Sequence, residues 1–122
     1  MIPLQPIIDA AQNGNSITLA PGTYIGPIRI NKMLKFSGEG KATILNTSPE
    51  AEVAVRILSD GVQLESLNIQ QNNNGEAAAV RVEADKDTLK NLAIHTAGLG
   101  IVLREANGGI ISNNKIRWLV YP

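Results

Sequence analysis

The sequence LESLNI at residues 64–69 returns in altered form as LKNLAI at residues 89–94 and as ISNNKI at residues 111–116. The first residues of these segments lie 25 and then 22 positions apart. A repeat of about 20 to 50 residues is typical of solenoids. Because one short repeat cannot bury its own apolar side, stacked repeats must supply the hydrophobic core.

Short runs that alternate apolar and polar residues surround this repeat. Examples are Ile-Arg-Ile at residues 28–30, Leu-Lys-Phe at residues 34–36 and Val-Arg-Val at residues 80–82. Three such strands in each round of about two dozen residues predict an all-β, single-stranded parallel β-helix of four to five coils, with about 4.8 Å between coils. An antiparallel sandwich or barrel is the alternative, but it requires hairpin turns and does not explain the aligned repeat.

A single domain over residues 1–122 follows from this reading. Residues 5–14 are predicted to form a short capping helix, because Pro6 suits a first turn and Gly14 suits a helix exit. The coils then occupy residues 16–117, and residues 118–122 begin an incomplete coil or an interface strand.

Composition narrows the classes of partner. The 122 residues contain 11 Lys plus Arg and 11 Asp plus Glu, so the net charge is zero, and only 3% are aromatic. Neither a basic footprint nor a set of stacking rings for nucleic acid is present, and no apolar run is long enough to span a membrane. We therefore expect neither nucleic acid nor a membrane as partner. The absence of cysteine excludes a disulfide framework.

Two groups of residues carry a family resemblance. The segment IDAAQNGNSITLAPGTY at residues 8–24 resembles the opening of right-handed β-helix proteins of the pectin-lyase-like superfamily, where a capping helix and a Pro-Gly-x-Tyr corner lead into the first coil. GIVL at residues 100–103 and ISNNKI at residues 111–116 are similar to repeats of the carbohydrate-binding and sugar-hydrolase group, which includes NosD-like proteins.

The resemblance implies a right-handed helix and an extracytoplasmic location, but it does not select an activity. The superfamily includes polysaccharide lyases, hydrolases, esterases, epimerases and proteins without enzymatic activity. The first residues lack the charged start and apolar stretch of a secretory signal, so we expect either a cytoplasmic protein or one whose signal has been removed.

Arginines recur at one position of the predicted strands. Arg29, Arg56 and Arg81 each stand between two apolar residues, 27 and then 25 positions apart, and Val102 takes the fourth equivalent position. If the strands stack, the three side chains form a column on one outer face. Guanidinium groups suit planar oxyanions, so the column is a candidate site for an acidic polysaccharide. The alternative is a solvated strand face whose arginines are neutralised by nearby glutamates.

Other polar residues are weaker candidates. Glu83, Asp85 and Asp87 are candidate Ca²⁺ ligands, although calcium requires six or more oxygens and a solvated turn explains them as well. His95 is the single histidine and has no partner in the sequence that would make it a base or a metal ligand. Asn114 replaces leucine at an inward position, and we expect it to bond to backbone.

The last residues are unusual for a solenoid. Trp118, Leu119, Val120 and Tyr121 begin a coil, and no polar capping element follows them. Exposed large aliphatic side chains at such an end each forfeit about 1.5 to 3 kcal/mol of burial. We therefore expect either a homo-oligomer joined through this end or further coils beyond it.

Three hypotheses of function remain open. The first is a short β-helix, not catalytic alone, that binds polysaccharide along its arginine face. The second is the N-terminal part of a longer lyase or hydrolase with its active site beyond residue 122, since the sequence contains no complete catalytic constellation. The third is a structural module that self-associates through its C-terminal edge. No cofactor other than Ca²⁺ is indicated.

Overall fold

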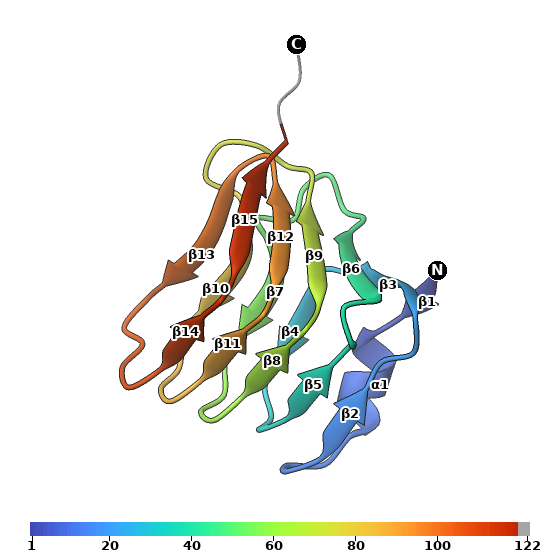
Figure 1. Cartoon of the computed structure of the whole chain (residues 1–122), viewed down its shortest axis with the longest axis vertical. Coiled ribbons are helices and arrows are strands. Elements are labelled where there is room, and N and C mark those ends of the chain that lie inside the picture. Colours follow the sequence, from blue (N-terminus) through green and yellow to red (C-terminus); the bar gives the residue numbers. More distant parts are fainter. Residues whose placement is uncertain (120–122) are drawn as a thin grey trace.

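The computed structural model describes residues 1–119 and has the predicted architecture: an all-β parallel solenoid of about five coils with one short N-terminal helix (Figure 1). Each complete coil contributes one strand to each of three sheets, which we name A, B and C. Neighbouring strands within every sheet come from successive coils and pair in parallel.

The bounds of the strands are as follows. Sheet A contains β1 (Ile2–Pro3), β3 (Gly22–Gly26), β6 (Ala42–Asn46), β9 (Asn68–Gln71), β12 (Ala93–Thr96) and β15 (Lys115–Trp118). Sheet B contains β2 (Ser16–Thr18), β5 (Lys35–Ser37), β8 (Gln63–Glu65), β11 (Thr88–Lys90) and β14 (Ile110–Ser112). Sheet C contains β4 (Ile28–Ile30), β7 (Val53–Ile57), β10 (Ala78–Val82) and β13 (Leu99–Leu103).

The repeat that predicted the fold also sets its register. Leu89 pairs with Leu64 on one side and with Ile111 on the other, and Ile94 pairs in the same way with Ile69 and Ile116. Equivalent aliphatic side chains therefore lie on top of one another and form the core. Leu67 and Leu92, at the corner between sheets B and A, are also buried, as predicted.

The same corner requires left-handed backbone. Ser66, Asn91 and Asn113 have φ values of 54°, 54° and 55°. Asparagine tolerates this region better than most residues. Asn114, the next residue, confirms the sequence prediction: its Oδ1 accepts a hydrogen bond from the Leu92 amide at 2.9 Å, and its Nδ2 donates to the Leu89 carbonyl at 3.0 Å.

A column of buried polar side chains at the corner between sheets A and C was not predicted. Asn46, Gln71 and Thr96 each accept a hydrogen bond from the backbone amide two residues later, at 3.0 to 3.1 Å. The side chains satisfy amides that the turn would otherwise leave unpaired. Their regular spacing of 25 residues was a signal in the sequence.

The N-terminal end of the solenoid is covered by α1 (Gln5–Ala10), which is shorter than the predicted helix over residues 5–14. Ala11 is already extended, and the Lys32 ammonium group donates hydrogen bonds to three carbonyls at the end of the helix, those of Ile8, Asp9 and Ala11. The side chain of Ile8 is fully buried. No helix in residues 1–119 has the length and apolarity needed to cross a membrane.

Candidate functional site

The predicted arginine column is present on the outer face of sheet C. Arg29 on β4 pairs in register with Arg56 on β7, which pairs with Arg81 on β10, and Val102 on β13 follows. Parallel strands are about 4.8 Å apart, so each guanidinium group lies one coil from the next. Arg29 is exposed, whereas the side chains of Arg56 and Arg81 are 36% and 16% exposed.

Glu83, a weak candidate for calcium in the sequence, neutralises part of this column. Its Oε2 lies 2.5 Å from Nε of Arg56 and 3.7 Å from Nε of Arg81. The hydrogen bond with Arg56 lowers the pKa of the Glu83 carboxyl and raises the pKa of the Arg56 guanidinium. The Nε atom of Arg81 is buried and has no hydrogen-bond partner. One carboxylate thus faces two guanidinium groups, which leaves a net positive charge on this group of three side chains.

Two adjoining hollows run along the same face, and we name them together the furrow. The first has a volume of about 480 Å³ and is lined by Arg29, Arg56 and Arg81 with one carboxylate, Glu52. The second has a volume of about 780 Å³, shares Ala51, Glu52 and Arg81 with the first, and continues to β13. Three glutamates, two arginines and three asparagines line it: Glu50, Glu52, Glu76, Arg81, Arg104, Asn72, Asn73 and Asn74. The furrow is therefore basic at the Arg29 end and mixed in charge at the other.

Two loops after sheet A form one wall of the furrow. The loop over residues 72–77 lies one coil beyond the loop over residues 47–52, and Asn73 joins them by donating from Nδ2 to the carbonyls of Ser48 at 3.0 Å and Ala51 at 2.8 Å. The neighbouring strands carry apolar residues in register beside the furrow: Val53 is half-buried, Ala78 is buried and Leu99 is exposed. The furrow thus combines an apolar strip, a row of guanidinium groups and a wall of amides.

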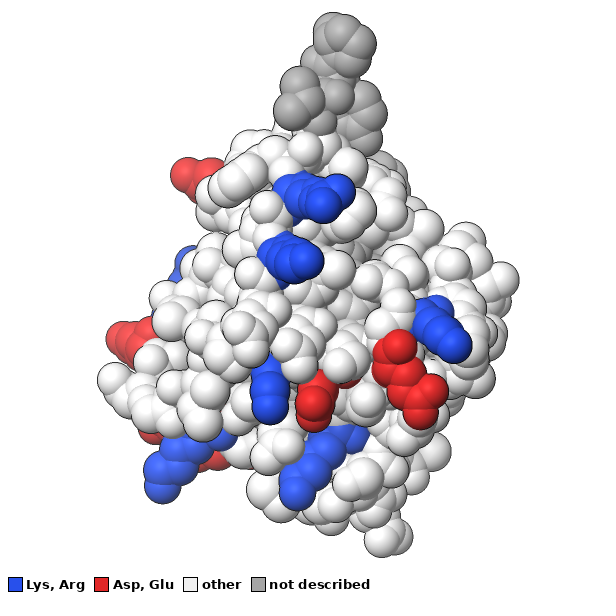
Figure 2. All heavy atoms as spheres, in the orientation of Figure 1, with Lys and Arg blue, Asp and Glu red and all other residues white. Residues whose placement is uncertain are grey.

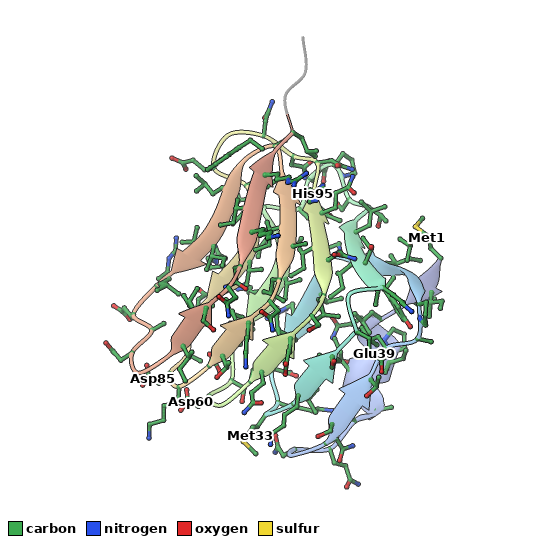
Figure 3. All side chains as sticks on the ribbon, in the orientation of Figure 1. Met1, Met33, Glu39, Asp60, Asp85 and His95 are labelled. Carbon is green, nitrogen blue, oxygen red and sulfur yellow. The ribbon has the colours of Figure 1, made fainter. Side chains whose placement is uncertain are left out.

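The three carboxylates proposed as calcium ligands do not converge. Glu83 faces the arginine column. Asp85 accepts a hydrogen bond from the Asn107 amide through Oδ1, and its own amide donates to Asp60 Oδ1 (Figure 3 shows Asp60 and Asp85 at the same corner). Asp87 points into the solenoid and accepts from the Val62 amide at 2.7 Å. Within residues 1–119 no three His, Cys, Asp or Glu side chains are grouped so as to hold a metal ion.

His95 lies on a different face of the molecule from the column of Arg29, Arg56 and Arg81. It is exposed on β12 of sheet A, in register with Gln70 and Arg117, and it borders a hollow of about 310 Å³ (Figure 3). Figure 2 shows this side of the protein, where lysines and arginines are interspersed with aspartates and glutamates among neutral residues. The structure brings no second titratable group of the described residues into that hollow.

The end of the solenoid formed by β13, β14 and β15 exposes its core positions. Leu103, Ile111 and Ile116 are well exposed, although their in-register partners one coil below, Val82, Leu89 and Ile94, are buried. Trp118 is 63% exposed and donates its indole N–H to the Gly98 carbonyl at 3.0 Å. The Leu119 amide donates to the Thr96 carbonyl, and Val120 and Tyr121 lie outside the described residues.

Comparison of the chain with protein-family models, with curated proteins and with solved structures yields no match. The structure therefore shows the coarser part of the sequence interpretation, a parallel β-solenoid. Membership of the pectin-lyase-like superfamily stays a prediction.

Proposed function

We propose that the protein binds an extended anionic polysaccharide along the furrow, with carboxylate or sulfate groups of the polymer placed on Arg29, Arg56 and Arg81. The observation that carries the proposal is the register of the three arginines inside one hollow. The resemblance of the sequence to the pectin-lyase-like superfamily agrees with a carbohydrate ligand.

A repeating ligand fits this site better than a compact one. The arginines recur once per coil along the solenoid axis, so a polymer with regularly repeated acidic groups meets one guanidinium group after another. The accessible parts of Val53 and Leu99 offer an apolar surface for the less polar faces of sugar rings. Asn72 and Asn74 add amide donors and acceptors at the wall.

The partial neutralisation by Glu83 affects the expected affinity. Arg29 forms no ion pair with a carboxylate among residues 1–119, whereas Arg56 is held by Glu83. An acidic group of the ligand therefore binds Arg29 freely and competes with Glu83 for Arg56. We expect each contact to be weak and salt-dependent, and we expect the overall affinity to rise when several contacts form along one polymer.

Affinity electrophoresis in gels that contain polygalacturonate, dextran sulfate or uncharged dextran tests the proposal. The double variant Arg29→Ala plus Arg56→Ala should lose about tenfold in affinity for the charged polymers, because two charge-assisted contacts are removed. Lys115→Ala plus Arg117→Ala removes the same charge from exposed positions on β15 and is the matched control. Equal losses in both double variants would show nonspecific attraction and contradict a site in the furrow.

A second function is favoured by the exposed core at the end formed by β13, β14 and β15: self-association of two copies through this end. The other end is covered by α1, so stacking of the two ends in a head-to-tail fibre is blocked. Two like ends that meet form a closed, isologous dimer. Sedimentation of the protein over a range of concentrations distinguishes this function from a monomeric polysaccharide binder.

A further inference from the structure

An aspartate occupies a position in the solenoid interior where other coils carry aliphatic residues. The register of β5, β8, β11 and β14 places Asp87 directly between Val62 in the coil below and Gly109 in the coil above, with Leu34 one coil further down. Leu34 and Val62 are fully buried, and Asp87 is only 4% exposed. From the N-terminal side, the residues at this position of successive coils are therefore Leu34, Val62, Asp87 and Gly109.

Only half of the Asp87 carboxylate has a partner. Oδ1 accepts the hydrogen bond from the Val62 amide, whereas Oδ2 is buried and has none. Leaving a buried carboxylate oxygen unpaired is unfavourable, and such an atom requires an explanation. A neutral asparagine would accept the same amide hydrogen bond, so support of the Val62 amide does not explain why the residue is an acid.

A cavity adjoins this carboxylate. Its volume is about 200 Å³, and apart from Asp87 its lining is uncharged: Val82, Ala84, Leu89, Leu103, Ala106 and Ile111, with Gly108 and Gly109. Gly109 leaves the space open, and it has to be glycine, because a Cβ there would lie 2.9 Å from the Asp87 carbonyl oxygen. The cavity lies at the end of the solenoid where Leu103 and Ile111 are exposed, so in a single copy of the chain a ligand reaches it from solvent.

We propose that this cavity binds a primary alkylammonium group, with the ammonium on Asp87 Oδ2 and the alkyl chain against Leu89, Leu103 and Ile111. The single buried carboxylate selects a cation, and the aliphatic lining selects a cation that carries an apolar chain. A metal ion is a poor alternative, because calcium requires six or more oxygen ligands. The volume is below that of sites for drug-sized molecules, which limits the alkyl chain to a few carbons.

The site is separate from the furrow on sheet C, and it does not depend on the proposed polysaccharide binding. Two sources supply the same chemistry: a free alkylamine, or the side chain of a lysine in a polypeptide that docks on this end of the solenoid. Leu103 and Ile111, which line the cavity beside Asp87, are 53% and 46% exposed, so we expect these side chains to move aside as an ammonium group approaches Oδ2.

Titration of the whole chain with n-butylammonium, followed by NMR shifts of the Leu103 and Ile111 methyl groups, tests the proposal. We expect saturable binding to the wild type that weakens at least tenfold in Asp87→Asn. The control is Asp85→Asn, which removes a carboxylate two residues from Asp87 that does not line the cavity. This variant should bind n-butylammonium as the wild type does. Uncharged n-butanol should bind at least tenfold more weakly than n-butylammonium.

A pH series on the wild type keeps the test decisive if Asp87→Asn fails to fold. Asp60 and Asp85 are the carboxylates near Asp87, Lys86 is its neighbour in sequence, and the remaining cavity residues do not titrate. Because n-butylammonium stays charged throughout, its affinity should fall about tenfold per pH unit once Asp87 is protonated. Affinity that does not change between pH 7.5 and pH 5 would overturn the proposal, as would equal binding of the amine and the alcohol.

A final arm separates the two sources. A tripeptide with one central lysine and blocked ends is compared with the same peptide acetylated at Nζ. Binding of the lysine peptide at least as tight as that of n-butylammonium indicates a docking polypeptide, whereas binding of the amine alone indicates a free metabolite. Failure of both ligands overturns the proposal.

Discussion

The Glu83 carboxylate lies 2.5 Å from the Nε atom of Arg56, one coil below it. This ion pair joins successive coils on the outer face of the solenoid, in the same column that we propose as the polysaccharide site. Its presence means that part of the charge predicted from the sequence is already neutralised within the protein. Removal of the Glu83 charge should therefore strengthen polysaccharide binding, whereas removal of an arginine should weaken it.

Replacement of Glu83 by glutamine should strengthen binding of polygalacturonate by several-fold, because Arg56 and Arg81 no longer share a carboxylate and the column gains one positive charge. The dependence of the affinity on salt should become steeper. Affinity electrophoresis at two salt concentrations measures both effects. Glu105→Gln, which makes the same change of charge at an exposed position outside the furrow, is the control. Unchanged or weaker binding in Glu83→Gln would count against the furrow.

The Asp87→Asn variant should be more stable than the wild type at pH 7.5. Burial raises the pKa of the Asp87 carboxyl to about 6, and the nearby carboxylates of Asp60 and Asp85 add to the effect. The unfolded chain has the ordinary pKa of about 4, so between pH 4 and 6 the folded state binds more protons than the unfolded state. This group therefore favours folding at low pH, and its contribution is lost as the pH rises through about 6.

Urea denaturation of both proteins at pH 4.5 and pH 7.5 checks this sign. The difference in free energy of unfolding between Asp87→Asn and the wild type should grow by about 2 kcal/mol between these two pH values. Comparison of the two proteins at each pH cancels the contributions of the other carboxylates. A difference that is constant over this range, or that shrinks as the pH rises, would contradict the environment described for Asp87.

Leu92→Asp should unfold the chain. Leu92 is fully buried at the corner between sheets B and A, and an aspartate there loses the apolar contacts of leucine and buries a charge without a partner. The combined cost, about 5 kcal/mol or more, approaches the whole stability of a small domain. Leu67→Asp, one coil below, should behave in the same way. Circular dichroism melts measure the effect, with the exposed Lys90→Asp as a control that should retain the wild-type transition.

Lys32→Met should loosen the N-terminal helix without unfolding the coils. The Lys32 ammonium donates to the carbonyls of Ile8, Asp9 and Ala11 at the end of the helix, where carbonyls lack a full set of intrahelical partners; of the three, the Ile8 carbonyl also accepts from the Ala11 amide. Loss of these hydrogen bonds should cost about 1 to 3 kcal/mol locally. Amide hydrogen exchange should accelerate for Ile8 and Ala11 and stay unchanged for Leu89. Lys35→Met, at an exposed position on β5, should leave both rates unaltered.

Trp118→Ala should weaken self-association if the end formed by β13, β14 and β15 is an interface. The indole is largely exposed and lies on the same strand, β15, as the uncovered core position Ile116. Sedimentation velocity at several concentrations measures the change in the proportion of dimer. Arg117→Ala alters the preceding residue on the outward side of β15 and should have little effect. A wild-type protein that remains monomeric at high concentration would remove this function altogether.

The sequence predicted the strand content and most of the register because a solenoid makes long-range contacts periodic. One column contains Leu64, Leu89 and Ile111, because each is about one coil from the next along the sequence. The same spacing aligned Arg29, Arg56 and Arg81. Glu83 was harder to place. It stands two residues after Arg81, so strand alternation places both side chains on the outer face, and its ion pair agrees with the alternative that nearby glutamates neutralise the arginines. The spacing did not reveal that Glu83 bonds most closely to Arg56 in the preceding coil.

The amino-acid sequence alone determined that the chain stacks in parallel coils, because an aliphatic pattern repeated every 22 to 25 residues is buried only when equivalent positions lie on one another. Only the tertiary structure decided which polar side chains share a surface. Glu83, Asp85 and Asp87 are adjacent in sequence, yet they face the arginine column, a ladder of backbone amides and the core. The reason is that corners change the direction of the backbone within one or two residues, and side-chain direction there depends on backbone angles that the residue spacing does not specify.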